Sequence, residues 1–596
     1  MFENQTEPTF GATRVVEPKT SSLRYLLLGW CKIIASDVVK ARALENRSET
    51  VVSYLLEALE ASSANASLDV KSLAKLVLRG DYISQLASVI AEETSDNEIA
   101  AYEQKVLETI AEIPEPDDGQ IEKLIANGLE YLPDAVIASI GAESFALSET
   151  LCAGVVGAAE NLRRSLEIEH DACCALDFEA QGLRNHLETL RPKERRERRA
   201  EITADAAAVE ERARNWREKN KMALDGIVDA LALLADEGAD DEKLYDALVN
   251  IGRVNAAALE TLEEGIKWRY GEQSPEAVLL SPKAGKCVLF MGDDLDALMQ
   301  LLNQAEYNEV DVWTHGDSIV AHSLKAFREK KRLVGHYGGS WRNQKSELGA
   351  FPGGILVASA PIEEPDGSYA PYIFTTKPSY CESVAVVPRK ADGSYNMSPV
   401  IRAAKDSSGF FRAQTLEKLP VGFGGETKVL DAVEHAARAI RDNRLEKIVV
   451  IGGQDANGDS NDYFTRLFAA VPSDAFVISF GDVKFRFDRS LITPTPYGVT
   501  KLVDVGSERD ANAALRFANT LTAELDREPG NAPLAFFVSL WGETSLAFLL
   551  SLCALGYRGG VVGPQPPACW TPAFVNAMRE RFGVRLADDP AADLAQ

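Results

Sequence analysis

Apolar residues repeat at helical spacing through the first 275 residues. Positions i, i+3, i+4 and i+7 are apolar, which is the pattern of a helix that buries one face. The clearest examples are residues 48–64, 98–113 and 241–266. Proline-containing breaks at 113–118 and 191–194 separate the helical sections. We therefore predict an all-helical domain over residues 1–275.

Residues 191–221 form a highly charged run in which both signs are mixed. Mixed charges at helical spacing are typical of a solvated helix that carries ion pairs between positions i and i+4. The run therefore predicts an exposed helix or helical hairpin. A docking surface for a protein partner is the alternative interpretation.

The pattern changes after residues 270–286. Short β-branched or apolar runs now alternate with helical stretches, as buried parallel strands with crossover helices do. The runs are residues 286–291, 309–315, 354–360, 447–453, 475–481 and 532–541. A polar, glycine-rich stretch near residues 406–425 divides them. We predict two Rossmann-like parallel-sheet domains, residues 284–415 and 416–596, and hence a multidomain α and α/β protein. No G-x-G-x-x-G sequence lies at a strand–helix turn, which disfavours dinucleotide binding.

The net charge of -27 disfavours nucleic acid or an anionic membrane as a partner, because both would repel the chain. No apolar run reaches the roughly 20 residues that span a bilayer. Residues 1–14 lack the basic start of a signal peptide. We therefore expect a cytoplasmic protein that binds neither nucleic acid nor membrane.

The eight cysteines show no metal-binding spacing. None of them forms C-x-x-C, and Cys173–Cys174 is a bare vicinal pair. We interpret most of them as small buried apolar residues. A protein organised around thiolate-bound iron has a different cysteine pattern.

Seven motifs at the ends of the predicted strands resemble those of a known family. They are GDDLDAL (292–298), VWTHGDSIVAH (312–322), FPGGILVASAPIEEP (351–365), VVIGGQDANG (449–458), FGDVKFRF (480–487), VGSERDANAA (505–514) and LWGETSLAF (540–548). In order and spacing, nearly the whole chain resembles the hybrid cluster protein family, also called the prismane or hydroxylamine reductase family. The resemblance implies that family's fold.

That family holds an iron–sulfur–oxygen cluster with one histidine, two glutamates and four cysteines. At the matching positions Asp293 stands for the histidine, Asp317 for one glutamate, and Glu543 keeps the other. The four cysteine positions carry Pro361, Gln454, Asp482 and Glu508, Ser545 replaces a lysine, and Glu3 and Thr6 stand for two cysteines of a second cluster. The resemblance therefore implies that both iron–sulfur clusters are lost, together with hydroxylamine or nitric oxide reduction.

In the family these side chains converge on one buried pocket, where several carboxylates need cations or protons. Three interpretations follow. In the first, a divalent Mn, Fe, Mg or Ca ion is bound by oxygen ligands, namely Asp293, Asp317, Gln454, Asp482, Glu508 and Glu543. In the second, Lys484, Arg486 and Arg509 neutralise the acids. In the third, the pocket binds a small molecule without metal, or an acid of raised pKa performs acid–base catalysis.

We therefore expect a repurposed or non-catalytic partner or scaffold protein, acting as a homodimer or with another protein. The alternative is an enzyme with a carboxylate-liganded metal site, of one or two ions, that works as an oxidoreductase or hydrolase. His315 and His322 are seven residues apart, which is not a zinc-binding spacing. We expect structural hydrogen bonds from both histidines.

Overall fold

The computed structural model describes residues 18–63, 68–92, 94–131, 145–236, 238–360, 362, 364–377, 381, 383–412, 417–455, 462–567 and 569–595. Within these ranges, no helix combines the length and the apolar character that a membrane crossing requires.

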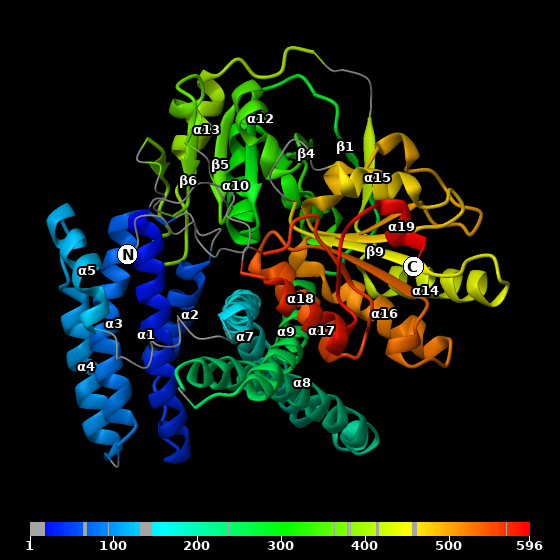
Figure 1. Cartoon of the computed structure of the whole chain (residues 1–596). Helices are drawn as coiled ribbons and strands as arrows, with labels where there is room; N and C mark the ends of the chain where they lie inside the picture. The colour runs from blue at the N-terminus through cyan, green and yellow to red at the C-terminus, as the bar shows by residue number, and fades with distance from the viewer. Residues whose placement is uncertain are drawn as a thin grey trace.

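The N-terminal half is helical, as the periodicity predicts. Its helices are α1 (Pro18–Ala43), α2 (Glu49–Ser62), α3 (Val70–Ile90), α4 (Asp96–Ala111), α5 (Asp118–Tyr131), α7 (Phe145–Thr189), α8 (Pro192–Leu234) and α9 (Asp241–Tyr270). Polar residues fix several starts: the side chains of Ser48, Asp69 and Asp240 accept hydrogen bonds from the first turns of α2, α3 and α9. Figure 1 shows α1 to α5 gathered on one flank of the molecule.

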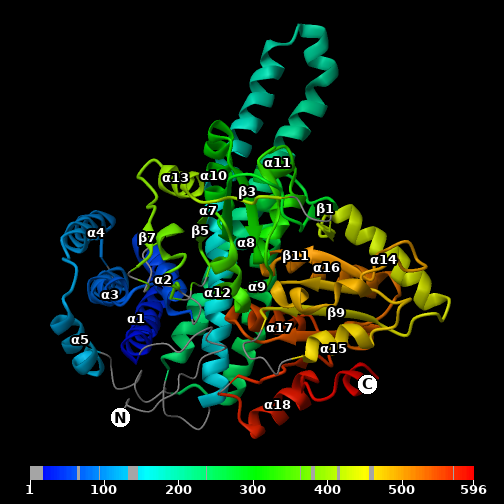
Figure 2. The same ribbon diagram turned by 90° about the horizontal axis from the view of Figure 1, so that it is seen from above.

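Helices α7 and α8 form a long antiparallel hairpin, and Figure 2 shows its far end projecting beyond the rest of the chain. The projecting part contains the highly charged run, which begins at Arg191. Ion pairs join neighbouring turns there, such as Arg191 with Glu194 and Arg198 with Glu201 at 3.4 Å. The prediction of an exposed, charge-paired helical hairpin is therefore confirmed.

The first sheet has six parallel strands in the order β4-β3-β2-β5-β6-β7. The strands are β2 (Cys287–Gly292), β3 (Asp311–His315), β4 (Leu333–His336), β5 (Gly354–Ala358), β6 (Ile373–Thr375) and β7 (Ala385–Val386). The helices of this unit are α10 (Leu295–Asn308), α11 (Lys325–Arg328), α12 (Gln344–Ala350) and α13 (Ser398–Asp406).

The second sheet repeats the topology, in the order β11-β10-β9-β12-β13-β14. Its strands are β9 (Ile448–Gly453), β10 (Val477–Phe480), β11 (Leu502–Gly506), β12 (Leu534–Ser539), β13 (Val561–Val562) and β14 (Arg585–Leu586). Its helices are α14 (Glu426–Arg441), α15 (Tyr463–Ala470), α16 (Asn512–Glu524), α17 (Glu543–Ala554), α18 (Pro572–Phe582) and α19 (Pro590–Ala595). Counted within each sheet, both orders are 3-2-1-4-5-6, the doubly wound order of Rossmann domains.

Two short strands connect the sheet units. β1 (Glu276–Leu279) pairs antiparallel with β8 (Lys418–Val421), so the chain before the first sheet is tied to the start of the second unit. The predicted fold class, a helical region followed by two Rossmann-like parallel sheets, is confirmed. The domain limits near residues 275 and 415 stay a prediction, because this pairing crosses the second of them.

Helix α17 packs closely on α7 and α9. A Cβ atom on Gly157 of α7 would lie 2.2 Å from the backbone oxygen of Glu543, and one on Gly252 of α9 would lie 2.1 Å from that of Leu550. Only glycine permits these approaches. They fix the start of α17, and with it Glu543, against the helical region.

Candidate functional site

A cavity of about 520 Å³ lies between helices α2, α3 and α7 and the carboxyl ends of the parallel strands. All six residues that the sequence selects line it: Asp293, Asp317, Gln454, Asp482, Glu508 and Glu543. The structure therefore brings the whole predicted set together. Ligands of doubly wound sheets bind outside the carboxyl ends of the strands, where the strand order reverses, and the cavity lies at this point of both sheets.

Tight turns after the strands aim these side chains at the cavity. Gly292 ends β2 with φ +121°, and a Cβ there would lie 1.7 Å from the oxygen of Ala358. Gly481 follows β10 with φ +76° and stands directly before Asp482. These conformations require glycine. After Asp293, the Asp294 side chain accepts a hydrogen bond from Ala297 N–H at 2.9 Å and starts α10.

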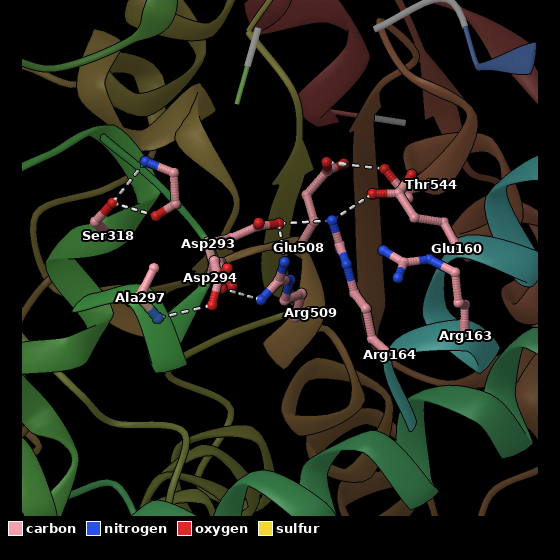
Figure 3. Close-up of polar contacts among 12 residues, drawn as sticks. Glu160, Arg163, Arg164, Asp293, Asp294, Ala297, Ser318, Glu508, Arg509 and Thr544 are labelled. Carbon is pink, nitrogen blue, oxygen red and sulfur yellow. Dashed lines mark hydrogen bonds and ion pairs between the residues drawn. The ribbon is translucent and has the colours of Figure 1, made fainter. Parts of the chain in front are cut away.

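Asp293 is held by two arginines, as Figure 3 shows. Its Oδ2 lies 2.6 Å from Arg164 of α7 and also pairs with Arg509. Arg164 pairs in turn with Glu160 at 2.5 Å. Burial, together with the neighbouring Arg164, lowers the pKa of Arg509 to about 10, so Arg509 is still a cation at neutral pH. Asp293 is thus neutralised by protein side chains.

The other two predicted neutralising bases are engaged elsewhere. Lys484 lies 2.9 Å from Asp504 and 2.8 Å from the backbone oxygen of Gly506. Arg486 pairs with Asp455. Neither acid belongs to the predicted set, so of the three bases named from the sequence only Arg509 pairs directly with a member of it. Arg164 was missed, because nothing in its local sequence indicates which strand end α7 faces.

The carboxyl groups of Asp317, Asp482 and Glu508 line the cavity and form no ion pair with another described residue. Burial raises the pKa of Asp317 to about 6, although Lys484 opposes this. Burial also raises the pKa of Glu508 to about 7. The pKa of Asp482 is well above its usual range because of burial and then repulsion from Asp317. Part of this set is therefore protonated near neutral pH.

Hydrogen bonds position most of these acids. Glu508 accepts from Thr544 at 2.8 Å and from Ser545 at 2.5 Å. Asp482 accepts from the backbone N–H of Asp455 at 2.5 Å, and Glu543 accepts from Ser63 at 3.2 Å. The backbone N–H of Gln454 donates to Ser545 Oγ at 3.1 Å. Asp317 differs: it makes no hydrogen bond to another described residue, and its Oδ1 is buried.

The two histidines singled out in the sequence make hydrogen bonds, as predicted. His315 Nε2 lies 2.8 Å from Glu347 Oε2, and His322 Nε2 lies 3.0 Å from Thr314 Oγ1. Burial lowers the pKa of His322 to about 4, so it is neutral at physiological pH. His315 lines the cavity, whereas His322 does not.

None of the eight cysteines, all of which belong to the described residues, lines this cavity. Seven are buried and only Cys174 is exposed, which confirms their interpretation as small apolar residues. Among the described residues, no three His, Cys, Asp or Glu side chains are grouped so that they could hold a metal ion. Pro361, Glu3 and Thr6, which also stand at family ligand positions, lie outside the described part of the chain.

Comparisons with known proteins agree with this architecture. A model of the Prismane/CO dehydrogenase family matches residues 17–594. The chain is 34% identical to hydroxylamine reductase of Burkholderia lata over 371 residues, which is 62% of this chain and 66% of that protein. It is 33% identical to hydroxylamine reductase of Rhodospirillum rubrum over 370 residues, with the same shares. The chain thus spans slightly less than two thirds of these relatives.

A solved structure shows the same fold at low sequence identity. Carbon monoxide dehydrogenase from Thermococcus sp. AM4 superposes with a TM-score of 0.58 at 13% identity, covering 80% of this chain and 95% of that one. At this identity the likeness establishes the fold alone.

Proposed function

The chain belongs to the Prismane/CO dehydrogenase family, and on that premise we propose that it is a repurposed member without iron–sulfur clusters, which acts as a non-catalytic partner or scaffold protein. It is related to hydroxylamine reductases but does not reduce hydroxylamine or nitric oxide.

The chemistry of the cavity wall carries this proposal. Iron–sulfur clusters need thiolate donors, or occasionally imidazole. No cysteine lines the cavity, and the six family ligand positions described there present carboxyl or amide groups. Two arginines already pair with Asp293, at the family's histidine position. These residues do not fit an iron–sulfur cluster.

Anaerobic purification followed by reconstitution with iron and sulfide tests the proposal. We expect sub-stoichiometric iron and acid-labile sulfide after desalting, no charge-transfer absorption from iron bound to sulfur, and no hydroxylamine consumption with a reduced viologen dye. Stoichiometric iron and sulfide together with hydroxylamine turnover would overturn the proposal. A known hydroxylamine reductase, treated in parallel, controls for the reconstitution.

A non-catalytic partner or scaffold protein acts by contact, and a second copy of this chain is the simplest partner. Light scattering coupled to size-exclusion chromatography measures this directly. A mass of about 65 kDa, set against the chain mass of 64.8 kDa, would contradict the homodimer and leave a different protein as the partner.

The second candidate function is an enzyme with a divalent metal in the cavity. One observation favours it: Asp317, Asp482 and Glu508 have raised pKa values and no described Lys or Arg paired with them, and a cation would relieve their repulsion. Mn, Fe, Mg or Ca would suit these ligands together with Asp293, Gln454 and Glu543. Elemental analysis of protein purified without chelators distinguishes the candidates, because stoichiometric metal without sulfide supports only this one.

A further inference from the structure

Two hydrogen-bond acceptors at the end of strand β3 are buried without a partner among the described residues. They are His315 Nδ1 and Asp317 Oδ1. Both residues line the cavity, and His315 is only 1% exposed. Buried polar atoms are seldom left without a hydrogen bond, so this pair points to a ligand that donates.

The surroundings of His315 fix which of its nitrogens carries the proton. Glu347 Oε2 accepts a hydrogen bond from the backbone N–H of Gly339 at 3.1 Å and lies 2.8 Å from His315 Nε2. A carboxylate oxygen accepts, so Nε2 must donate. In the neutral imidazole, Nδ1 then carries no proton, and its lone pair can only accept a hydrogen bond. With His315 neutral, the wall of the cavity therefore offers an acceptor at this point.

The charges of the wall favour a cation. Among the described residues that line the cavity, eight carry carboxyl groups and five are lysine or arginine. The two arginines near the strand ends, Arg164 and Arg509, already form ion pairs with Asp293. The Nε atoms of these two arginines also lack partners, but they belong to guanidinium groups already engaged with that carboxylate.

The volume of the cavity and the arrangement of its side chains favour an organic cation over a bare metal ion. A cavity of about 520 Å³ falls within the range of small-molecule sites. No three described His, Cys, Asp or Glu side chains are grouped to hold a metal ion. Trp341 also lines the cavity, and its indole N–H donates a hydrogen bond to the backbone oxygen of Asp455 at 3.1 Å. Its remaining surface is the ring, which attracts organic cations.

We propose that the cavity binds a small organic cation with several N–H donors, a primary amine or a guanidine, whose charged group donates to Asp317 and His315. This proposal rests on the proposed function, since a resident iron–sulfur cluster would occupy the same cavity. It goes beyond it by naming the chemical class of the ligand.

Isothermal titration calorimetry of the full chain with 1,4-diaminobutane tests the proposal, and 1,4-butanediol serves as the uncharged probe of the same length. We expect saturable binding of one diamine per chain and no binding of the diol. Asp317→Asn keeps the shape and removes the charge, and it should weaken diamine binding at least about tenfold. Asp474→Asn, at an exposed acid outside the cavity, is the matched control and should leave binding unchanged.

The variant His315→Phe tests the second acceptor, because it keeps a ring and removes Nδ1. This variant should also weaken binding of the diamine, provided that its circular dichroism matches that of the unaltered chain. Equal binding of diol and diamine, unchanged diamine binding in Asp317→Asn, or an equal loss in Asp474→Asn would each overturn the proposal. Binding of MnCl2 without binding of the diamine would overturn it in favour of a metal site. Because the iron and sulfide assay is independent, failure here leaves the proposed function standing.

Discussion

Asp293 and Arg164 form an ion pair of 2.6 Å that joins the end of strand β2 to helix α7, nearly 130 residues earlier in the chain. Arg509, from the second sheet unit, pairs with the same carboxylate oxygen of Asp293. Three parts of the molecule therefore meet at one carboxylate, and the side chains of Asp293, Arg164 and Arg509 are 22%, 12% and 14% exposed.

The first prediction concerns Asp293→Asn. The change leaves two largely buried arginines without their shared carboxylate, so the free energy of unfolding should fall by about 2–4 kcal/mol. Urea unfolding followed by circular dichroism measures this. Asp474→Asn, at an exposed acid, should change stability by less than about 0.5 kcal/mol. Equal effects of the two variants would show that the Asp293 pairs contribute nothing to stability.

The second prediction concerns the dependence of stability on pH. The folded chain raises the pKa of Asp317 to about 6 and that of Glu508 to about 7, so it holds protons that the unfolded chain has released. The contribution of these groups is complete below their unfolded pKa values near 4 and is lost as the pH rises through the folded values. The contribution of these groups to the free energy of unfolding should therefore fall as the pH rises from about 4 to about 7.

The variant Asp317→Asn isolates the contribution of the Asp317 carboxyl group to this pH dependence. The amide cannot ionise, so the variant should gain stability relative to the unaltered chain at about pH 7.5 and gain less at about pH 5. Urea unfolding at both pH values gives the comparison. A gain of the same size at both would mean that the Asp317 carboxyl is not protonated preferentially in the folded state.

The third prediction concerns the thiols. Burial raises the pKa of Cys152 to about 11 and those of Cys287, Cys553 and Cys569 to about 12, which removes the reactive thiolate. Only Cys174 is exposed. Iodoacetamide should therefore alkylate one cysteine in the native chain and all eight after denaturation. Peptide mass spectrometry identifies the sites, and rapid native alkylation of other cysteines would contradict the burial described above.

The fold could be predicted because it depends on local pattern, whereas the convergence of the site residues on one cavity was implied by the resemblance to the hybrid cluster protein family. Apolar periodicity separates the helical half from the strands, and Asp293, Asp317 and Asp482 follow the ends of β2, β3 and β10, where all three line the cavity. The pairing of charges could not be predicted, because it depends on packing between distant segments. Arg164 reaches Asp293 only because α7 passes the strand ends, and Lys484 is engaged by Asp504, a strand residue that carries no motif.

The last prediction concerns two glycines of helix α7 with opposite surroundings. Gly157 meets the backbone of Glu543, and a Cβ would lie 2.2 Å from its oxygen, whereas a Cβ on Gly182 would have no atom within 4 Å. Gly157→Ala should lower the free energy of unfolding by about 1–3 kcal/mol, because backbone must move. Gly182→Ala should raise it by about 0.5–1 kcal/mol, because alanine favours the helix.

The same pair of variants tests whether the close approach of α17 to α7 shapes the cavity. Gly157→Ala pushes the start of α17, where Glu543 lines the cavity beside Thr544, which donates to Glu508. We therefore expect Gly157→Ala to weaken binding of 1,4-diaminobutane, and Gly182→Ala to leave it unchanged. Calorimetry on both variants, at a temperature where each is fully folded, separates this local displacement from the loss of stability. Unchanged binding in Gly157→Ala would mean that the start of α17 does not determine the cavity's affinity.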